Sequence, residues 1–559
     1  MFVDPTKVAI LCRGLRAIAD EMVLNLVRSA FSTVVREARD CSTAILDAKG
    51  RVVAQAEMIP IQTAALSVSF QSAAEQLDLE NWASPDSVVI MNDPYSGGQH
   101  LNDVIIFHPI FFEGQLLGWS GSTAHHLDIG GATAGVNTQA TELIQEGLII
   151  PPLLLDVKEH WHGGSIEKFI LANIRTAEIG LGDFNAQFAA NHVGRERILE
   201  IARREGAQVV RAAMEASLDY SERRMRAAIA DLPNGSWQGE AFLDRDVFED
   251  KPVKFAVTVT VAGDEMTLDF TGSSPQLRGM FNCTAAAARA AAVTAVRSVL
   301  ADLDIPANDG CDRPLTLIIP EGSVLNPRRG APVRARNAAA LRALDAVHAA
   351  LAKAIPDRVP SQGFNTTTGF YITKPLEDGT SRIYLDVFGG GFGAAKNYDG
   401  CHATDNILSS CRITPVESIE QKHPHLLIHH FSLVPDSGGA GEFAGGLGFV
   451  RGIEVRDDGI FLNLYSDRHI LPPKGFNGGG DGGRGSLRVR RDDEIIQLTA
   501  TSTFTLKRGD VIELTAGGGA GWGDPTKRNQ VAVESDLANG FISPEAARRD
   551  YGWTAPAAK

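Results

Sequence analysis

The sequence contains little that would tie the protein to an oxidising compartment or to a membrane. Its six cysteines are scattered along 559 residues and form no C-x-x-C pair, so a disulfide framework is not expected. No apolar run approaches the roughly 20 residues that a membrane-spanning helix requires, and the opening MFVDPTKVAI lacks the apolar core of a signal peptide. We therefore expect a cytoplasmic protein with reduced thiols and no membrane contact.

Positive charge is also in deficit. The chain has 53 lysines and arginines against 68 aspartates and glutamates, which gives a formal net charge of -15 at pH 7. Nucleic acids and anionic membranes bind positively charged surfaces, so neither is an expected partner. A small molecule or another protein remains as the expected ligand.

Motifs for nucleotide binding and for nucleophilic catalysis are missing as well. No glycine cluster fits G-x-x-x-x-G-K-[ST], and none opens a strand-to-helix G-x-G-x-x-G unit. There is no G-x-S-x-G elbow, and no cysteine has an obvious local base, which disfavours a serine or cysteine nucleophile. The 56 glycines are instead expected in tight turns and at close approaches of the backbone.

The pattern of apolar residues predicts a multidomain α+β fold of mixed helices and strands. We assign residues 1–234, with N-terminal helices, a hairpin and a long helical segment, to a metal-site domain. Residues 235–380 mix strands with alanine-rich helices and form a middle domain. Residues 381–559 are β-rich and interrupted by glycine loops, which predicts a C-terminal domain. No fixed period links the glycine clusters, so a solenoid or propeller is excluded.

The stretch from Asp93 to Gly131 concentrates groups that bind metals. It reads DPYSGGQHLNDVIIFHPIFFEGQLLGWSGSTAHHLDIGG and holds four of the fourteen histidines of the chain. Its middle predicts a β-hairpin with a turn at Glu113-Gly114-Gln115. A hairpin returns the chain on itself, so the loop before its first strand lies beside the end of its second strand. The histidines and aspartates at these two places should therefore converge.

The hairpin brings together a set of candidate ligands. His100 and Asp103 form H-x-x-D before the first strand, and His125 and His126 end the second. Because adjacent residues of a strand point to opposite faces, only one of these two histidines can face the loop. Two imidazoles with one or two carboxylates suit zinc or manganese, with an open position for water or a substrate oxygen. Taken alone, each of these histidines is better explained as a structural residue, and Asp40 as a turn or capping residue; it is the clustering that favours a metal.

A second candidate binding feature precedes a predicted helix further along the chain. In APVRARN, Arg334 and Arg336 are placed to hold an anion at the N-terminus of that helix. Surface ion pairs explain the two arginines equally well, so both interpretations stay open.

Several stretches, in this order and spanning nearly the whole chain, resemble the hydantoinase B family: DPYSGGQHLNDV, AHHLDIGG, EGLIIPP, PANDGCDRP, PEGSVLNP, TPVESIE, DSGGAGEFAGGLG and GGGAGWGDP. That family includes B subunits of ATP-dependent hydantoinases, the corresponding half of 5-oxoprolinases, caprolactamase subunits, and subunits of acetone and acetophenone carboxylases. The resemblance implies that a divalent metal, zinc or manganese, is held by Asp40, His100, Asp103 and His125. It thereby selects His125 over His126.

The resemblance also implies a mechanism shared with a partner. A hydantoinase A-like ATPase subunit would use ATP to phosphorylate a cyclic amide or ureide, and this chain would complete hydrolysis of the C–N bond at its metal. Asp128 or His126 would orient a ligand or relay a proton, with Glu146 as a further candidate for the general base. The expected assembly is a hetero-oligomer of A2B2 composition. Two alternatives stay open: a subunit of an ATP-dependent ketone carboxylase, and a non-catalytic scaffold for a partner ATPase.

Overall fold

The N-terminal part of the chain is built on a six-stranded antiparallel sheet. In this computed structural model, residues 5–56, 58–300 and 305–554 are described. The strands follow one another across the sheet in the order β2-β1-β5-β4-β3-β6. Their bounds are β1 Cys41–Asp47, β2 Val52–Gln55, β3 Ser87–Met91, β4 Asp103–Phe112, β5 Gln115–His125 and β6 Leu153–Asp156. Strands β4 and β5 form the predicted hairpin. Its turn is Glu113-Gly114, where positive φ angles of 50° and 75° match a tight two-residue hairpin.

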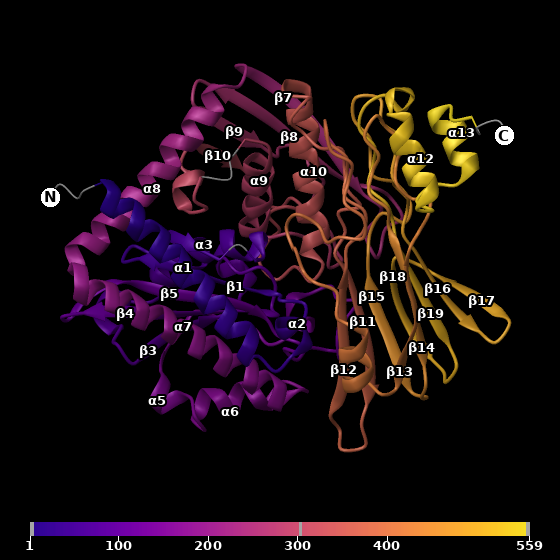
Figure 1. The fold of residues 1–559 in the computed structure, drawn as a ribbon. Helices are drawn as coiled ribbons and strands as arrows, with labels where there is room; N and C mark the ends of the chain where they lie inside the picture. Colours follow the sequence, from indigo (N-terminus) through magenta and orange to yellow (C-terminus); the bar gives the residue numbers. More distant parts are fainter. Residues whose placement is uncertain (1–4, 57, 301–304, 555–559) are drawn as a thin grey trace.

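Helices cover both faces of this sheet (Figure 1). Helices α1 and α7 pack on one face, while α3 packs on the other with Phe70 against Phe107 and Trp119. Side chains alternate between the two faces along each strand, and because helices cover both faces, the strands are buried almost throughout. The helices of this part are α1 Pro5–Ser29, α2 Thr33–Arg36, α3 Pro60–Gln76, α4 Leu79–Trp82, α5 Val157–His160, α6 Ser165–Ala172, α7 Ala177–Glu205 and α8 Ala207–Ala230, with single 3-10 turns at Pro94–Ser96 and Leu143–Gln145.

The middle part pairs a smaller sheet with two alanine-rich helices. Its strands are β7 Gly235–Leu243, β8 Val253–Ala262, β9 Glu265–Asp269 and β10 Leu315–Ile318, in the order β10-β9-β8-β7, and its helices are α9 Ala285–Leu300 and α10 Arg336–Ala354. Helix α10 packs closely on β7, because Gly239 has no Cβ: one placed there would lie 2.0 Å from the Ala346 carbonyl oxygen. A 3-10 turn at Asp309–Asp312 lies between α9 and β10.

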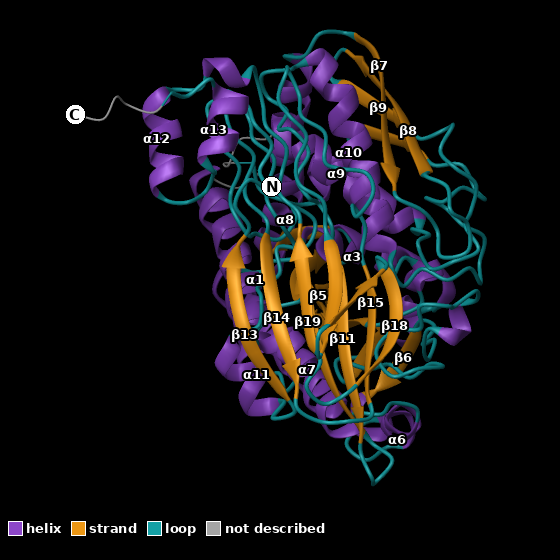
Figure 2. Cartoon of the chain, turned by 90° about the vertical axis from the view of Figure 1, so that its right-hand side faces the viewer, coloured by secondary structure: helices purple, strands orange, loops and turns teal. Residues whose placement is uncertain are grey.

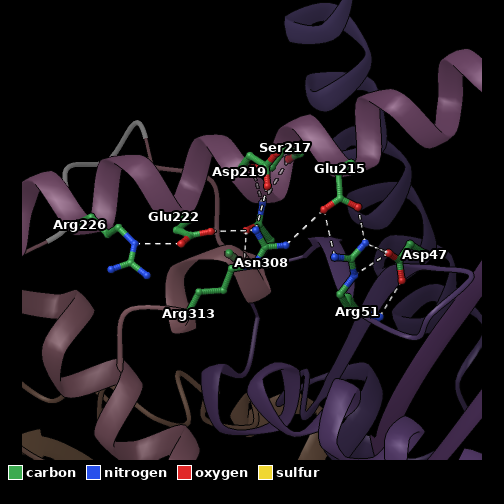
Figure 3. Close-up of polar contacts among 10 residues, drawn as sticks. Asp47, Arg51, Glu215, Ser217, Asp219, Glu222, Arg226, Asn308 and Arg313 are labelled. Carbon is green, nitrogen blue, oxygen red and sulfur yellow. Dashed lines mark hydrogen bonds and ion pairs between the residues drawn. The ribbon is translucent and has the colours of Figure 1, made fainter. Parts of the chain in front are cut away.

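A partly exposed network of ion pairs joins the N-terminal sheet to this middle part (Figure 3). Arg51, after the β1–β2 turn, contacts Asp47 and Glu215 of α8. Further along α8, Glu222 receives a hydrogen bond from Arg313, which follows the 3-10 turn, at 2.9 Å. Such exposed pairs typically contribute at most about 1 kcal/mol each, so the network orients α8 more than it stabilises the fold.

The C-terminal part begins with a sandwich of two sheets (Figure 2). The inner sheet has the order β12-β11-β15-β18, and the outer sheet has the order β13-β14-β19-β16-β17. Along β11, Phe370 and Ile372 enter the core between the sheets, whereas Tyr371 faces the core shared with α10. The strands are β11 Thr368–Pro375, β12 Ser381–Phe388, β13 Leu426–Leu433, β14 Phe449–Val455, β15 Ile460–Tyr465, β16 Ser486–Arg491, β17 Glu494–Leu498, β18 Thr501–Leu506 and β19 Val511–Ala516.

The glycine clusters form an array of extended segments beyond the ends of these strands. Residues 389–400, 437–448, 475–485 and 516–523 run alongside one another and exchange backbone hydrogen bonds. Gly391 donates to Gly517 at 2.9 Å, and Gly519 donates to Gly446 at 2.9 Å. A Cβ on Gly391 would lie 1.9 Å from the Gly446 oxygen. These glycines therefore permit close approach of the backbone, one of the two roles expected of them. Helices α11 Val416–Lys422, α12 Gln530–Ala538 and α13 Pro544–Tyr551, with a 3-10 turn at Pro525–Lys527, complete the described fold.

The predicted α+β class is confirmed, with several antiparallel sheets and interspersed helices. The divisions after residues 234 and 380 stay predictions as boundaries of domains. No helix among the described residues is both long enough and apolar enough to cross a membrane.

The close packing of the glycine array can be tested by substitution. We expect Gly391→Ala to lower the free energy of unfolding by about 1–3 kcal/mol or more, because the new methyl group has no room against the Gly446 carbonyl. Gly14→Ala is the control: its Cβ would meet nothing within 4 Å in the middle of α1, where alanine is the better helix former. Scanning calorimetry of both variants should give a lower apparent Tm for the first alone. An unchanged Tm for Gly391→Ala would contradict the close packing of the array.

Candidate functional site

Three of the predicted ligands form a row across one end of the N-terminal sheet. Asp103 on β4 lies directly opposite His125 on β5. On the other side of β5, the His125 N–H donates to the Asp40 carbonyl at 3.0 Å. Asp40 directly precedes β1. The short α2 segment ends at Arg36, and Arg39, with a positive φ of 60°, turns the chain into the strand. The hairpin therefore brings together residues that are far apart in sequence.

Two further side chains complete this row from outside the sheet. His100 lies in the turn before β4, with its ring centroid 5.0 Å from that of His125 and its Nε2 3.3 Å from Asp103 Oδ2. Gln62 of α3 donates its amide N–H to Asp40 Oδ1 at 2.7 Å and to Asp103 Oδ1 at 3.2 Å. One amide thus bridges both carboxylates, which sets their separation and orientation.

Burial and one arginine determine the charges of this cluster. Burial lowers the pKa of His100 to about 3, and burial with the nearby His100 lowers the pKa of His125, so both imidazoles are neutral at pH 7. Burial and repulsion from Asp103 raise the pKa of Asp40. Burial also opposes ionisation of Asp103, but the interactions of its carboxylate with His100 and with the Arg336 guanidinium outweigh burial and lower its pKa. Arg336 donates to Asp103 Oδ2 at 2.7 Å.

The donor set suits a divalent metal in its chemistry. Two neutral imidazoles and two carboxylates are ligands that zinc and manganese accept. Among the described residues, no hydrogen-bond partner is found for the buried His125 Nδ1, whereas His100 Nε2 faces Asp103 Oδ2 at 3.3 Å. Throughout the described residues, however, no group of three or more His, Cys, Asp or Glu side chains is arranged to hold a metal ion. Arg336 and Gln62 contact the carboxylate oxygens instead. Metal binding therefore stays a prediction.

The inner sandwich sheet provides the opposite wall of the site. Gly369, Tyr371, Leu385, Val387 and Tyr465 project from one face of β11, β12 and β15, and they line a cavity together with the cluster. The cavity has space for a water molecule or a small ion. The site is thus a narrow crevice between the N-terminal sheet and the sandwich.

His126 points away from this crevice. It follows His125 at the end of β5, so its ring lies on the opposite face of the sheet, 4.2 Å from the ring of Phe184 in α7. Its Nε2 lies 3.0 Å from Gln187 Oε1. Asp128 instead accepts hydrogen bonds from the backbone N–H and the guanidinium of Arg175.

Glu146 lies on the segment that precedes β6 and contacts the residues before α10. Its two carboxylate oxygens accept the backbone N–H groups of Val333 and Arg334 at 3.1 and 2.9 Å. Burial raises the pKa of Glu146 to about 7. Arg334 in turn reaches towards the cluster, with its NH1 3.5 Å from His100 Nδ1. Glu146 is therefore linked to the cluster through Arg334.

Sequence reasoning missed several residues of the crevice. Gln62 lies on a helix without any distinguishing pattern, and Tyr371 and Tyr465 lie on strands several hundred positions after the hairpin. Only Arg336 had a signal, as the second arginine of APVRARN. Of the two interpretations given for that arginine, the surface ion pair is wrong, because its side chain is 5% exposed and pairs with a fully buried aspartate.

The chain is similar to known proteins over nearly its whole length. A family model described as hydantoinase B/oxoprolinase matches residues 4–525. The B subunit of a putative D-/L-hydantoinase from Pseudomonas sp. (strain NS671) is 32% identical, with 99% of this chain and 95% of the relative covered. The beta subunit of caprolactamase from Pseudomonas jessenii is 30% identical, with 98% of this chain and 96% of the relative covered.

Solved structures agree with these matches. The crystal structure of ATP-dependent caprolactamase from Pseudomonas jessenii matches with a TM-score of 0.91 at 27% identity, and covers 100% of this chain and 97% of that chain. A nucleotide-free acetone carboxylase structure matches with a TM-score of 0.86 at 19% identity, over 99% of this chain and 80% of that chain, which is a likeness of fold. The chain belongs to the hydantoinase B/oxoprolinase family.

Proposed function

We propose that the protein is the B subunit of an ATP-dependent cyclic amidohydrolase, which opens the C–N bond of a cyclic amide or ureide. The observation that carries this proposal is the cluster of two neutral imidazoles and two carboxyl groups at one end of the hairpin, His100, His125, Asp40 and Asp103. Similarity to a hydantoinase subunit and to a caprolactamase subunit supports the choice of reaction.

The chemistry explains why two subunits are needed. An unstrained cyclic amide resists water because resonance stabilises its carbonyl group, and phosphorylation turns the carbonyl oxygen into a leaving group. The proposed partner is a hydantoinase A-like ATPase in an A2B2 hetero-oligomer, and it uses the ATP. The six cysteines are free, which fits the reducing conditions of the cytoplasm, where we place the assembly.

Asp40, His100, Asp103 and His125 would hold the metal, which we propose to be zinc or manganese. When bound, the ion would supply a Lewis acid that polarises the substrate and lowers the pKa of water. Gln62 sets the spacing of the two carboxylates, and burial keeps both imidazoles neutral and able to bind. The narrow crevice excludes bulk water from the reacting group.

We assign supporting roles to three further residues. His126 fixes the end of β5 through Gln187, and Asp128 fixes the loop after it through Arg175, so both orient His125 from behind. Glu146 stays a candidate for the general base, since burial brings its pKa to about 7; its two oxygens accept the Val333 and Arg334 N–H groups, through which it also positions Arg334. A scaffold protein would have no use for such a buried set of imidazoles and carboxylates, which argues against that alternative.

Activity with a partner is the direct test of the reaction. We expect ring opening only when the chain, a hydantoinase A-type subunit and ATP are combined, measured as ADP and ring-opened product over a panel of hydantoins and lactams. Ketones with bicarbonate form the control panel. Carboxylation of a ketone without hydrolysis of any cyclic amide would replace the proposal with the carboxylase alternative. Micromolar binding of ATP to the isolated chain, in calorimetry, would contradict the division of labour.

Metal content tests the cluster independently of substrate. We expect about one zinc or manganese per wild-type chain, and nearly none in His100→Ala or in the isosteric Asp103→Asn, since each removes a ligand. His429→Ala serves as the matched control, because His429 is a partly exposed residue of β13 whose ring contacts Glu454. Elemental analysis of the four purified proteins decides the matter. Equal metal in all of them would refute the assignment.

The two adjacent histidines give a sharper comparison. His125→Ala should empty the site, because it removes an imidazole from the crevice. His126→Ala should retain metal with affinity reduced by about 10–100-fold, since that ring acts from the opposite face of β5. Titration of both variants with zinc in one buffer measures the difference. The reverse order of affinities would show that the ligand is His126.

A further inference from the structure

A second cavity, which we call the α7 groove, lies between the N-terminal sheet and helices α5 and α7. Its volume is about 550 Å³, within the range of roughly 300–1,000 Å³ that small-molecule sites have. His108 of β4 lines the groove and lies five residues after Asp103, which is about 17 Å along the strand. The α7 groove is therefore separate from the crevice that holds the cluster.

One face of α7 forms a wall of the groove. The residues of α7 that line it are Asn185, Phe188, Ala189, His192 and Arg195. Their spacing of three, four, seven and ten positions places all five on the same side of the helix. At 1.5 Å per residue, this wall is about 15 Å long, with an amide at one end, a phenyl ring in the middle, and an imidazole and a guanidinium at the other end.

The middle of the groove is apolar. Phe188 faces it from α7, Val88 from β3 and Val157 from α5. The indole of Trp161 packs edge-on against the Phe188 ring, with centroids 5.0 Å apart at 67°, which limits movement of that ring. Covering such a surface with an apolar ligand is favourable, because it removes the surface from water.

The guanidinium end of the groove has hydrogen-bond donors to spare. Arg195 NH1 donates to the Pro85 carbonyl at 3.0 Å and lies 3.3 Å from His108 Nε2, whereas its NH2 makes no hydrogen bond with any described residue. Burial lowers the pKa of His108 to about 4, so its ring is neutral at pH 7. Since a guanidinium only donates, Nε2 is the acceptor and the proton lies on Nδ1, for which the described residues provide no partner.

The amide end also has a free donor. Asn185 Oδ1 accepts the indole N–H of Trp161 at 3.0 Å, which fixes the orientation of the amide. The amide nitrogen of Asn185 has no hydrogen-bond partner within the described part of the chain. It is therefore available to a carbonyl or hydroxyl oxygen of a ligand.

The charge of the lining is positive, in a chain whose net charge is -15. Among the described residues that line the groove, Asp86 is the one acid, and Lys158 neutralises it at 3.0 Å. Arg195 has an acidic neighbour in Glu196, 3.5 Å from its Nε, but Glu196 does not line the groove. One positive charge is thus left facing an apolar cavity.

We propose that the α7 groove binds a small carboxylate with an elongated apolar body, as in medium-chain or aryl-substituted carboxylic acids. This inference goes beyond the proposed function and does not rest on it. Arg195 and His192 bind the carboxylate, whose planar shape suits a guanidinium, and Phe188 contacts the apolar body. Phe188 directly follows Gln187, which contacts His126 behind the cluster, so the ligand packs on the helix that supports the cluster.

Calorimetry on the isolated full-length chain, freed of metal with a chelator, tests this site. Octanoate is the probe, octanamide is its neutral counterpart, and acetate is a carboxylate without the apolar body. We expect octanoate to bind, and both other compounds to bind at least about tenfold more weakly. Octanamide lacks the charge that strengthens the hydrogen bonds to Arg195, and acetate lacks the apolar contact.

Two variants locate the binding. Arg195→Gln should weaken octanoate binding by about tenfold or more, since it removes the guanidinium. Ala189→Phe should abolish binding, because Ala189 is exposed in the groove and a ring there occupies the space without entering the core. Arg203→Gln is the matched control: Arg203 is an exposed arginine of the same helix outside the groove, and this variant should bind as wild type does.

The inference has several ways to fail. No binding of octanoate overturns it, and so does equal binding of octanamide or full binding by both groove variants. If Arg195→Gln does not fold, because Arg195 also holds the Pro85 carbonyl, Ala189→Phe decides alone. Loss of binding when a hydantoinase A-type subunit is added would identify the groove as a subunit interface and also overturn the inference. None of these results depends on ring opening, so the site can fail while the amidase assay succeeds.

Discussion

The ion pair between Arg336 and Asp103 is the contact on which the site depends. The two side chains are 5% and 0% exposed, and their atoms lie 2.7 Å apart. Asp103 and Asp40 occupy one end of the same sheet and repel each other, so the cluster needs a buried positive charge. Removal of one partner of such a pair typically costs about 3–5 kcal/mol, because the other charge is left unpaired in the interior. The same contact fixes the start of α10 against the hairpin.

Helix α10 connects the hairpin to the middle sheet and to the sandwich. It is buried on nearly all sides, which its alanines permit, and it packs on β7, β8 and α9. Asp345 on the helix forms an ion pair with Arg468, which follows β15, at 2.7 Å. It also accepts a hydrogen bond from Asn365, which precedes β11, at 2.9 Å. Arg468 adopts a left-handed φ of 63°, a conformation that this buried ion pair helps to hold. The helix thus sets the distance between the hairpin and the wall that carries the tyrosines.

The hairpin, and the alternation of its side chains between the two faces of the sheet, could be predicted from the sequence because both follow local rules. A two-residue turn at Gly114 fixes the register, and the register places Asp103 opposite His125 and turns His126 away. Asp40 required the family resemblance, since a boundary aspartate has no distinct pattern. Tyr371 and Tyr465 could not be found, because their position depends on how the sandwich packs against α10. No property of nearby residues encodes that packing.

The glycine array affects what spectroscopic and exchange measurements in solution would report about the C-terminal part. Its amides are bonded across segments, as from Gly391 to Gly517, yet its residues belong to no helix or strand over most of their length. Circular dichroism would count these residues as irregular, whereas deuterium exchange would find their amide protons slow. Most residues of the array are glycines, so backbone hydrogen bonds hold its segments together more than side-chain packing does. Segments without regular secondary structure would then be among the most rigid parts of the molecule.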